Sequence, residues 1–298
     1  MPDEFSLILL HHLSTTFKIK IKYMSLNQND TLAQKASKRL LPLIEKYYRT
    51  QYKGLDNIPD EGFLGVGNHL GVYFIPESYL WLGKYHTLKG KPPMKVLVHS
   101  AFKQLINVFR MNDESLGILD ANPKNAIRSL QEGNAVTVYP GGDRENTKPF
   151  SQRNTIDFFG HYGYIRTALK AGVPILPVVG IGGGETLFVL SSGQQLAKRS
   201  RITKMMKLHS WPIYWSFPFG WHIGHLPNIS LPLPSQITIS VLPPIYLADY
   251  TAEDANDEAK LEEINERVTS MMQIEMNLLA KGRIPFIGKL PKNTFLKS

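Results

Sequence analysis

Several kinds of site and segment are missing from this sequence. It has no cysteine among its 298 residues, which excludes disulfide bonds, thiolate metal ligands and cysteine nucleophiles. No uninterrupted apolar run reaches the roughly 18 residues of a membrane-spanning helix, so we predict none. The short apolar patch Phe5–Leu10 follows two acidic residues rather than a basic region, and we predict no signal peptide. Any contact with a membrane is therefore expected from one side.

Charge is also missing from one long stretch. Residues 208–248 contain no Asp, Glu, Lys or Arg, and seven prolines exclude a single spanning helix. The segment just before it, Lys198–Lys207, has five basic residues and no acidic one. One interpretation is core strands with a Pro-rich loop. The other is a membrane-interface surface, with Trp211, Trp215 and Trp221 at the lipid boundary beside the basic segment. Nucleic acid would also suit basic residues beside aromatics, but we do not expect it as a partner.

The overall composition fits a globular protein with an anionic partner. Apolar residues make up 43% of the chain and charged residues 20%, which argues against wholesale disorder. The formal net charge is +9 and the sequence pI about 9.5. Such a balance favours a nucleic acid, an anionic membrane or a phosphorylated substrate.

Apolar periodicity predicts strands that alternate with helices. This pattern is typical of a single α/β domain with a mostly parallel mixed sheet of about seven strands, flanked by helices. We expect a basic arm and amphipathic helix over residues 1–50, the core over 51–248, and a C-terminal helix and tail over 249–298, packed on the core. The predicted strands are Gln51–Pro59 (ending in a turn), Phe63–Gly67, Lys95–His99, Ala135–Tyr139, Val173–Ile181 and Gln236–Val241. The predicted helices are Thr31–Tyr48, Ile75–Tyr85, Ala101–Phe109, Asn122–Leu130, Gly160–Ala171 and Asp254–Ala280.

The most informative single stretch is Asn68-His69, which ends a short apolar run ahead of Gly71. A strand that passes into a loop and then a helix presents side chains at the open end of a sheet, where α/β proteins bind ligands. A histidine there can take a proton from a hydroxyl near neutral pH. The alternative interpretation is a loop histidine held by hydrogen bonds.

Further along the chain, three blocks read YPGGDRE (139–145), PFSQRNTIDFFG (149–160) and VPILPVVGIGGGET (173–186). Together with the Asn-His pair, they resemble in order the motifs of the glycerophospholipid/lysophospholipid acyltransferase family, and most closely a bacterial branch with Pro-Gly-Gly in the third motif. The resemblance covers roughly Gln51 to Pro244. It implies a glycerol-3-phosphate acyltransferase-like fold, attached peripherally to the cytoplasmic side of a membrane.

The resemblance also implies a reaction. A fatty acyl group would move from acyl-CoA or an acyl carrier protein, as co-substrate, to a hydroxyl of a glycerolipid such as a lysophospholipid, lysophosphatidate or diacylglycerol. His69 matches the family's general base, which acts without an acyl-enzyme. No metal and no bound cofactor are expected.

The acid that should assist His69 is displaced from its usual position. The family's NH-x4-D motif would place it at residue 74, which is Phe74. Glu77 is the nearest downstream acid, but eight residues of continuous helix span about 12 Å, so it can serve only if the chain bends before it. Asp143, in the third motif, is a second candidate. We prefer Glu77.

The third motif supplies the predicted anion or oxyanion cradle. Gly141 and Gly142 let backbone N–H groups approach a negative charge closely. Arg144 corresponds to the family's phosphate-binding arginine, with an ion pair to Asp143 or Glu145 as the alternative. Because Gly141 stands where the better-known branch has glutamate, neutral acceptors such as diacylglycerol are also expected.

Three further residues complete the predicted substrate contacts. Arg110 matches the arginine of the family's second motif loosely, and Arg153 is either a second anion contact or a surface charge. Asn68 is expected to fix the turn with an Asx-type hydrogen bond. The fourth motif, Val173–Pro177, would shape the acyl pocket.

Two rivals to an acyltransferase stay open. A hydrolase or thioesterase could use the same base, but no Gly-x-Ser-x-Gly nucleophile motif is present. A lipid-binding protein that has lost catalysis would fit the missing acid at Phe74.

Overall fold

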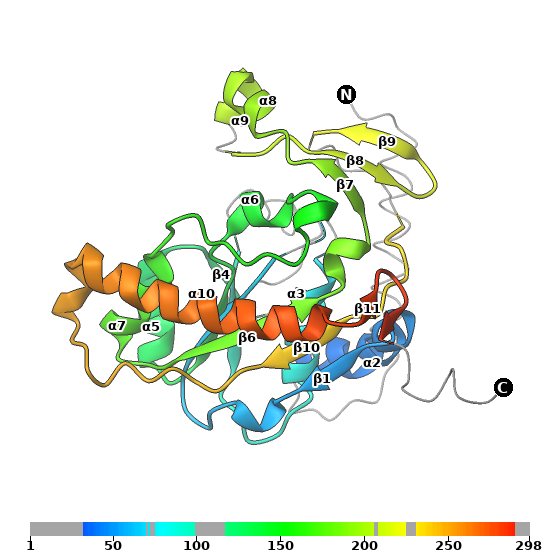
Figure 1. The fold of residues 1–298 in the computed structure, drawn as a ribbon. Coiled ribbons are helices and arrows are strands. Elements are labelled where there is room, and N and C mark those ends of the chain that lie inside the picture. Colours follow the sequence, from blue (N-terminus) through cyan, green and yellow to red (C-terminus); the bar gives the residue numbers. More distant parts are fainter. Residues whose placement is uncertain are drawn as a thin grey trace.

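The computed structural model describes residues 32–69, 71, 75–98, 117–205, 208–224 and 231–289. Its centre is a seven-stranded sheet in the order β1-β10-β6-β2-β5-β3-β4 (Figure 1). Only the β10–β6 pair is antiparallel, so the sheet is mixed but mostly parallel, as predicted. The strands are β1 (Gln51–Lys53), β2 (Leu64–Gly67), β3 (Met94–Val98), β4 (Ile118–Asp120), β5 (Ala135–Val138), β6 (Ile175–Ile181) and β10 (Thr238–Val241).

Helices cover both faces of this sheet. One face packs against α5 (Pro123–Gln131), α7 (Gly163–Ala171) and α10 (Glu258–Ala280), and the other against α2 (Leu32–Tyr47) and α3 (Pro76–Tyr85). The two-residue period of β6 separates the faces, because Val179 joins the first core and Val178 the second. Burial on both faces explains the nearly continuous apolar runs of the central strands.

Local signals placed most of these elements. Asn122 caps α5 by accepting a hydrogen bond from the N–H of Lys124, and Pro123 begins the helix. The short strand β4 was not predicted. The predicted helix Ala101–Phe109 and the basic arm before residue 32 lie outside the described residues. Where we expected only a tail after Arg283, residues 283–289 form an antiparallel hairpin of β11 (Arg283–Ile284) and β12 (Gly288–Lys289).

A second, smaller sheet follows β6 and stands apart from the main sheet (Figure 1). It consists of β7 (Phe188–Ser191), β8 (Ile213–Ser216) and β9 (Gly220–Ile223), with the short helices α8 (Gln194–Arg199) and α9 (Arg201–Met205) inserted after β7. The uncharged stretch is therefore divided: β10 is a core strand, while β8 and β9 form this outer sheet. Among the described residues, no helix is both long enough and apolar enough to cross a membrane.

Candidate active site

Three loops meet at one edge of the main sheet. Because β2 lies between β5 and β6 and is parallel to both, the carboxyl ends of these strands share that edge. Asn68 and His69 follow β2, the third motif follows β5, and the glycine-rich end of the 173–186 block follows β6. The topology therefore gathers the motifs that lie far apart in the sequence.

Asn68 locks the end of β2 to β6. Its buried amide donates to the carbonyl of Gly180 (2.9 Å) and accepts from the N–H of the same residue (2.8 Å). This two-way bond fixes the point at which the chain leaves the sheet. Within the described part of the chain, the Asn68 amide makes these two hydrogen bonds. The predicted Asx-type hydrogen bond would involve Leu70, which is not among the described residues. The contacts of Asn68 are thus structural ones.

The His69 side chain is half-buried at this edge, with its Nδ1 covered. Burial lowers its pKa to about 4, so the imidazole is neutral at physiological pH. The ring lies 4.8 Å from the Tyr139 ring, and its Nδ1 has no hydrogen-bond partner in the described part of the chain. The His69 backbone N–H donates to Glu145 Oε2 at 3.1 Å. A neutral, half-buried histidine can accept a proton, and the position of His69 is tied to the third motif.

Glu145, which joins the third motif to His69, was missed as a site residue. It is fully buried, and burial raises its pKa to about 7 although the nearby Lys148 ammonium opposes that shift. Lys148 Nζ lies 3.1 Å from Glu145 Oε1 and also donates to the carbonyl of Thr155. The sequence did contain a signal for this ion pair. Glu145 lies on the short helix α6 (Gly142–Asn146) and Lys148 follows the helix, three residues further along the chain.

The same glutamate explains Gly141. A Cβ at position 141 would lie 2.3 Å from the Glu145 Cβ and 2.4 Å from its Oε2. The Glu145 carboxyl therefore occupies the space that a side chain at position 141 would need. Gly142, in contrast, has open space around it but adopts φ +55°, which glycine accommodates without strain. The loop geometry depends on both glycines for different reasons.

Glu77 lies in the first turn of α3, which begins at Pro76 after Ile75 with φ +28°. The chain therefore bends before Glu77, as its predicted role requires. Its carboxyl packs on the main chain that follows β6, since a Cβ at Gly183 would lie 1.7 Å from Oε1. Burial raises its pKa to about 8, the N–H groups of Glu77 and Gly183 partly offset this, and the charges of two other glutamates add to it.

No ion pair joins Glu77 to His69. Neither oxygen of Glu77 makes a hydrogen bond of good geometry with a described residue, and no carboxylate contributes to the lowered pKa of His69. Tyr139 is the residue common to both. Its ring lies beside the His69 ring, and the Glu77 charge adds to the burial that raises the Tyr139 pKa. The preferred acid is thus at the correct edge of the sheet but not in contact with the base.

The other candidate acid points elsewhere. Asp143 Oδ2 accepts hydrogen bonds from the backbone N–H of His209 (2.6 Å) and of Ser210 (3.1 Å), and Oδ1 lies 3.3 Å from His209 Nδ1. Asp143 therefore connects the third motif to the segment that leads into the outer sheet.

Two of the three arginines predicted to contact substrate, Arg144 and Arg153, lie among the described residues. The Arg144 guanidinium stacks on Phe159 at 4.0 Å, and no ion pair with Asp143 or Glu145 is present within the described part of the chain. Arg153 stacks on Phe150 at 4.1 Å and donates to its carbonyl, with Nε buried and unpartnered among the described residues. Arg110 lies outside the described residues.

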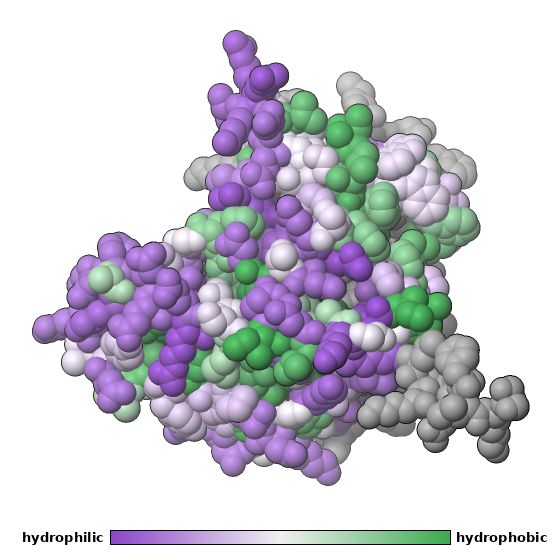
Figure 2. Space-filling view, viewed as in Figure 1, coloured by the Kyte–Doolittle hydropathy of each residue, from purple (hydrophilic) through white to green (hydrophobic). Residues whose placement is uncertain are grey.

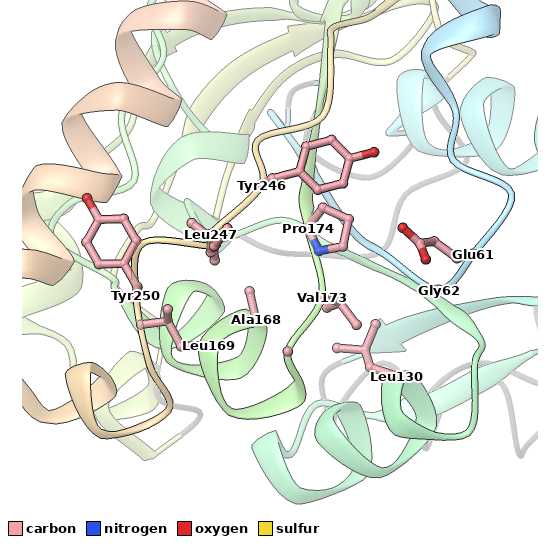
Figure 3. A pocket seen from close by; sticks show the side chains of 12 residues that line it. Glu61, Gly62, Leu130, Ala168, Leu169, Val173, Pro174, Tyr246, Leu247 and Tyr250 are labelled. Atoms are coloured by element: carbon pink, nitrogen blue, oxygen red, sulfur yellow. The ribbon is translucent and has the colours of Figure 1, made fainter.

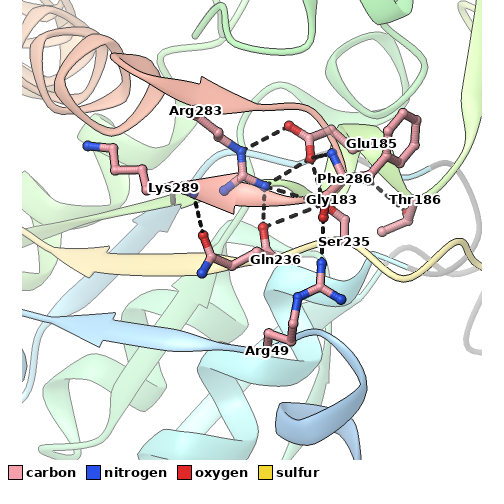
Figure 4. Close-up of polar contacts among 9 residues, drawn as sticks. All are labelled: Arg49, Gly183, Glu185, Thr186, Ser235, Gln236, Arg283, Phe286 and Lys289. Atoms are coloured by element: carbon pink, nitrogen blue, oxygen red, sulfur yellow. Dashed lines mark hydrogen bonds and ion pairs between the residues drawn. The ribbon is translucent and has the colours of Figure 1, made fainter. Parts of the chain in front are cut away.

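A second buried acid, Glu185 in the 173–186 block, was also missed, and it is fully paired. Arg283 makes a two-pronged ion pair with it, at 3.0 and 2.9 Å, and the Ser235 hydroxyl and Phe286 N–H donate to the same carboxylate (Figure 4). The Arg49 guanidinium donates to the carbonyl of Phe286, and the backbone N–H of Lys289 donates to the side-chain oxygen of Gln236 (Figure 4). This cluster docks the β11–β12 hairpin on the end of β6.

The described residues also form a cavity of about 470 Å³ at the opposite edge of the sheet (Figure 3). Glu61, Val173 and Tyr246 are among its lining residues, and it lies where β2 and β6 begin rather than end. It is therefore separate from His69. No group of three possible metal ligands occurs among the described residues.

Comparisons with known proteins agree with the motif analysis. Residues 49–180 match the model of the Acyltransferase family. Uncharacterized proteins of Mycobacterium tuberculosis and Mycobacterium leprae are 28% and 27% identical over 240 residues, or 80% of this chain. The chain spans 64% and 62% of their respective lengths.

A solved structure, the 1-acyl-sn-glycerophosphate acyltransferase PlsC from Thermotoga maritima, is 18% identical to this chain. The structural match covers 87% of this chain and 89% of the PlsC chain. Its TM-score is 0.46, too low for residue roles to be carried from one chain to the other. The family match rests on the segment that contains the Asn-His pair and the third motif. Residues 49–180, which hold His69 and the loop that positions it, are the part of the chain that is similar to the Acyltransferase family.

Proposed function

We propose that the protein transfers a fatty acyl group from an acyl thioester, either acyl-CoA or an acyl carrier protein, to a hydroxyl of a glycerolipid. The observation that carries the proposal is the neutral, half-buried His69 at the carboxyl end of β2, within the segment that matches the family. Lysophosphatidate, another lysophospholipid and diacylglycerol are the acceptors we consider. Both donors are acidic, which suits a chain of formal charge +9.

In the proposed mechanism His69 takes the proton from the acceptor hydroxyl as its oxygen attacks the thioester carbonyl. The tetrahedral intermediate then collapses, the carbon–sulfur bond breaks, and the proton passes from His69 to the departing thiolate. N–H groups of the Gly141–Gly142 turn are proposed to stabilise the oxyanion. Arg144 and Arg153, whose guanidinium groups each stack on a phenyl ring, are proposed to hold the anionic part of donor or acceptor.

Glu77 is proposed to assist His69 in its ionised form. Burial keeps His69 neutral but also makes it a weak base, and a nearby carboxylate would strengthen it by stabilising the imidazolium. Since Glu77 is protonated below about pH 8, this assistance is expected to grow as the pH rises toward that value. Closure of the gap between the two side chains on substrate binding would be required.

We further propose that the protein is peripheral on the cytoplasmic side of an anionic membrane, where its acceptor lipid resides. The basic net charge and the exposed apolar side chains of the outer sheet support this placement. No bound cofactor or metal is proposed.

The test is acyl transfer from radiolabelled acyl-CoA and from acyl carrier protein to a panel of the three acceptor classes. Wild type is compared with His69→Ala, and we expect transfer to one class that falls by about a hundredfold or more in the variant. Circular dichroism of both proteins checks that the substitution leaves the fold intact. Equal transfer by the two proteins would contradict the role of His69.

One observation favours a second candidate, a lipid-binding protein without catalysis: no described carboxylate forms a hydrogen bond or ion pair with the His69 ring. In that case neither donor would support transfer to any acceptor, while lipid would still bind to both proteins. Release of free fatty acid without transfer would instead indicate a thioesterase.

A further inference from the structure

We propose that the outer sheet and the two helices beside it are a docking face for an anionic lipid bilayer. This face comprises the exposed side of the β8–β9 hairpin and the basic helices α8 and α9. The proposal rests on the function proposed above, because it supplies the surface from which the acceptor lipid would reach the site. The membrane contact would thus be made by specific apolar and basic side chains, and not by the basic net charge of the whole chain alone.

The β8–β9 hairpin exposes large apolar side chains at its turn and along one side. Phe217, Phe219, Trp221 and Ile223 are each between 51% and 59% exposed. Strand alternation explains the arrangement along β9: Trp221 and Ile223 point outward, while His222 between them stacks on the buried Tyr214 at 5.3 Å. Exposed apolar side chains gathered in this way mark an interaction surface rather than a core.

Positive charge lies directly beside these side chains. Lys198 and Arg199 on α8 and Arg201 and Lys204 on α9 are all exposed, and residues 188–224 contain no acidic residue. In Figure 2 the hydrophilic projection formed by α8 and α9 stands next to hydrophobic and intermediate side chains over β7–β9. A bilayer with anionic headgroups complements both parts, since basic residues bind headgroups and aromatic residues favour the interfacial zone.

The docking face is tied to the candidate active site at two points. β7 begins three residues after Glu185, in the segment that leaves the end of β6, at the same edge of the sheet as His69. The Asp143 carboxylate of the third motif accepts hydrogen bonds from the N–H groups of His209 and Ser210, just before β8. A bilayer held on this face would therefore lie near the edge from which a lipid acceptor must enter.

The test is sedimentation with vesicles of phosphatidylcholine alone and with phosphatidylserine added. Phe219→Ser/Trp221→Ser/Ile223→Ser removes the apolar part, and Lys198→Glu/Arg201→Glu reverses the charge. We expect each variant to bind anionic vesicles at least about tenfold more weakly than wild type. Ile274→Ser/Leu278→Ser on α10 and Lys124→Glu/Lys170→Glu on the main domain are matched controls at exposed positions, and should bind as wild type does.

His69→Ala should also bind vesicles like wild type, which separates failure of docking from failure of catalysis. Transfer to a short-chain acceptor below its micellar concentration should be nearly unchanged in both docking variants, which also shows that they fold. Equal vesicle binding by docking variants and controls would overturn the proposal. So would light scattering in which the apolar variant converts a dimer to a monomer without changing vesicle binding, because the face would then bind a second copy.

Discussion

Two buried glutamates at one edge of the sheet, Glu77 and Glu185, have opposite surroundings. Glu185 accepts hydrogen bonds from Arg283, Ser235 and Phe286, and its charge is compensated in place. Glu77 is equally buried, yet neither of its oxygens makes an ion pair or a hydrogen bond of good geometry with a described residue. A fully paired carboxylate stabilises a fold, while an unpaired one that destabilises it is typical of a functional site.

The largest effect on stability is expected from breaking the ion pair between Arg283 and Glu185. Arg283→Ala leaves the Glu185 charge buried without its counterion, and should lower the free energy of unfolding by about 3–5 kcal/mol. Urea denaturation followed by circular dichroism measures this loss. Lys281→Ala, which removes a neighbouring basic residue outside the ion pair, is the control. A loss below about 1 kcal/mol would mean that the cluster in Figure 4 contributes little to stability.

Glu77→Gln should leave the fold intact but lower acyl transfer by about a hundredfold, since a neutral amide cannot stabilise the His69 cation. The rising limb of activity toward pH 8 should disappear in the same variant. Steady-state rates across pH 6 to 9 measure both effects. Glu185→Gln serves as the contrast: it should lose stability first and activity only where the protein unfolds. Unchanged activity in Glu77→Gln would assign the acid to another residue.

The smallest expected effect is a change in the free energy of unfolding with pH. The pKa of Glu77 is raised from 4.5 to about 8 in the folded state, so its contribution to stability is complete below pH 4.5 and is lost as the pH rises through 8. Glu77→Gln cannot titrate, and its stability relative to wild type should increase by about 1.4 kcal/mol between pH 6 and pH 7. Denaturation midpoints at the two pH values test this. If the stability of both proteins changed with pH in the same way, the pKa of Glu77 would not be raised in the folded state.

Much of the fold could be predicted from the sequence because its signals are local. Apolar runs bounded by turn residues gave the central strands, and Asn122-Pro123 gave the start of α5. The outer sheet and the β11–β12 hairpin were not predicted: their strands have only two to four residues, and some of the contacts that hold them are distant in the sequence. Gln236, for example, accepts from the N–H of Lys289 through its side chain. Such pairings leave no periodic pattern.

For the site, motifs identified the loops but not which side chains meet. His69 and Glu77 were expected as partners and lie at the same edge without contact, while Asp143 bonds to the segment before β8. Glu145 escaped notice because its role depends on a backbone N–H of His69, which has no residue-type signature. Sequence can show which residue types are present, but not which main-chain group a buried carboxyl will reach.

The crowding between Gly141 and Glu145 has a consequence for how the family varies. Because a Cβ at position 141 would overlap the Glu145 side chain, a chain with a larger residue at 141 cannot keep this glutamate in the same place. The two positions should therefore covary among homologues: glycine at the first with glutamate at the second, or a side chain at the first with a different residue at the second. A lineage passing from one arrangement to the other must change both, and with them the support beneath the histidine.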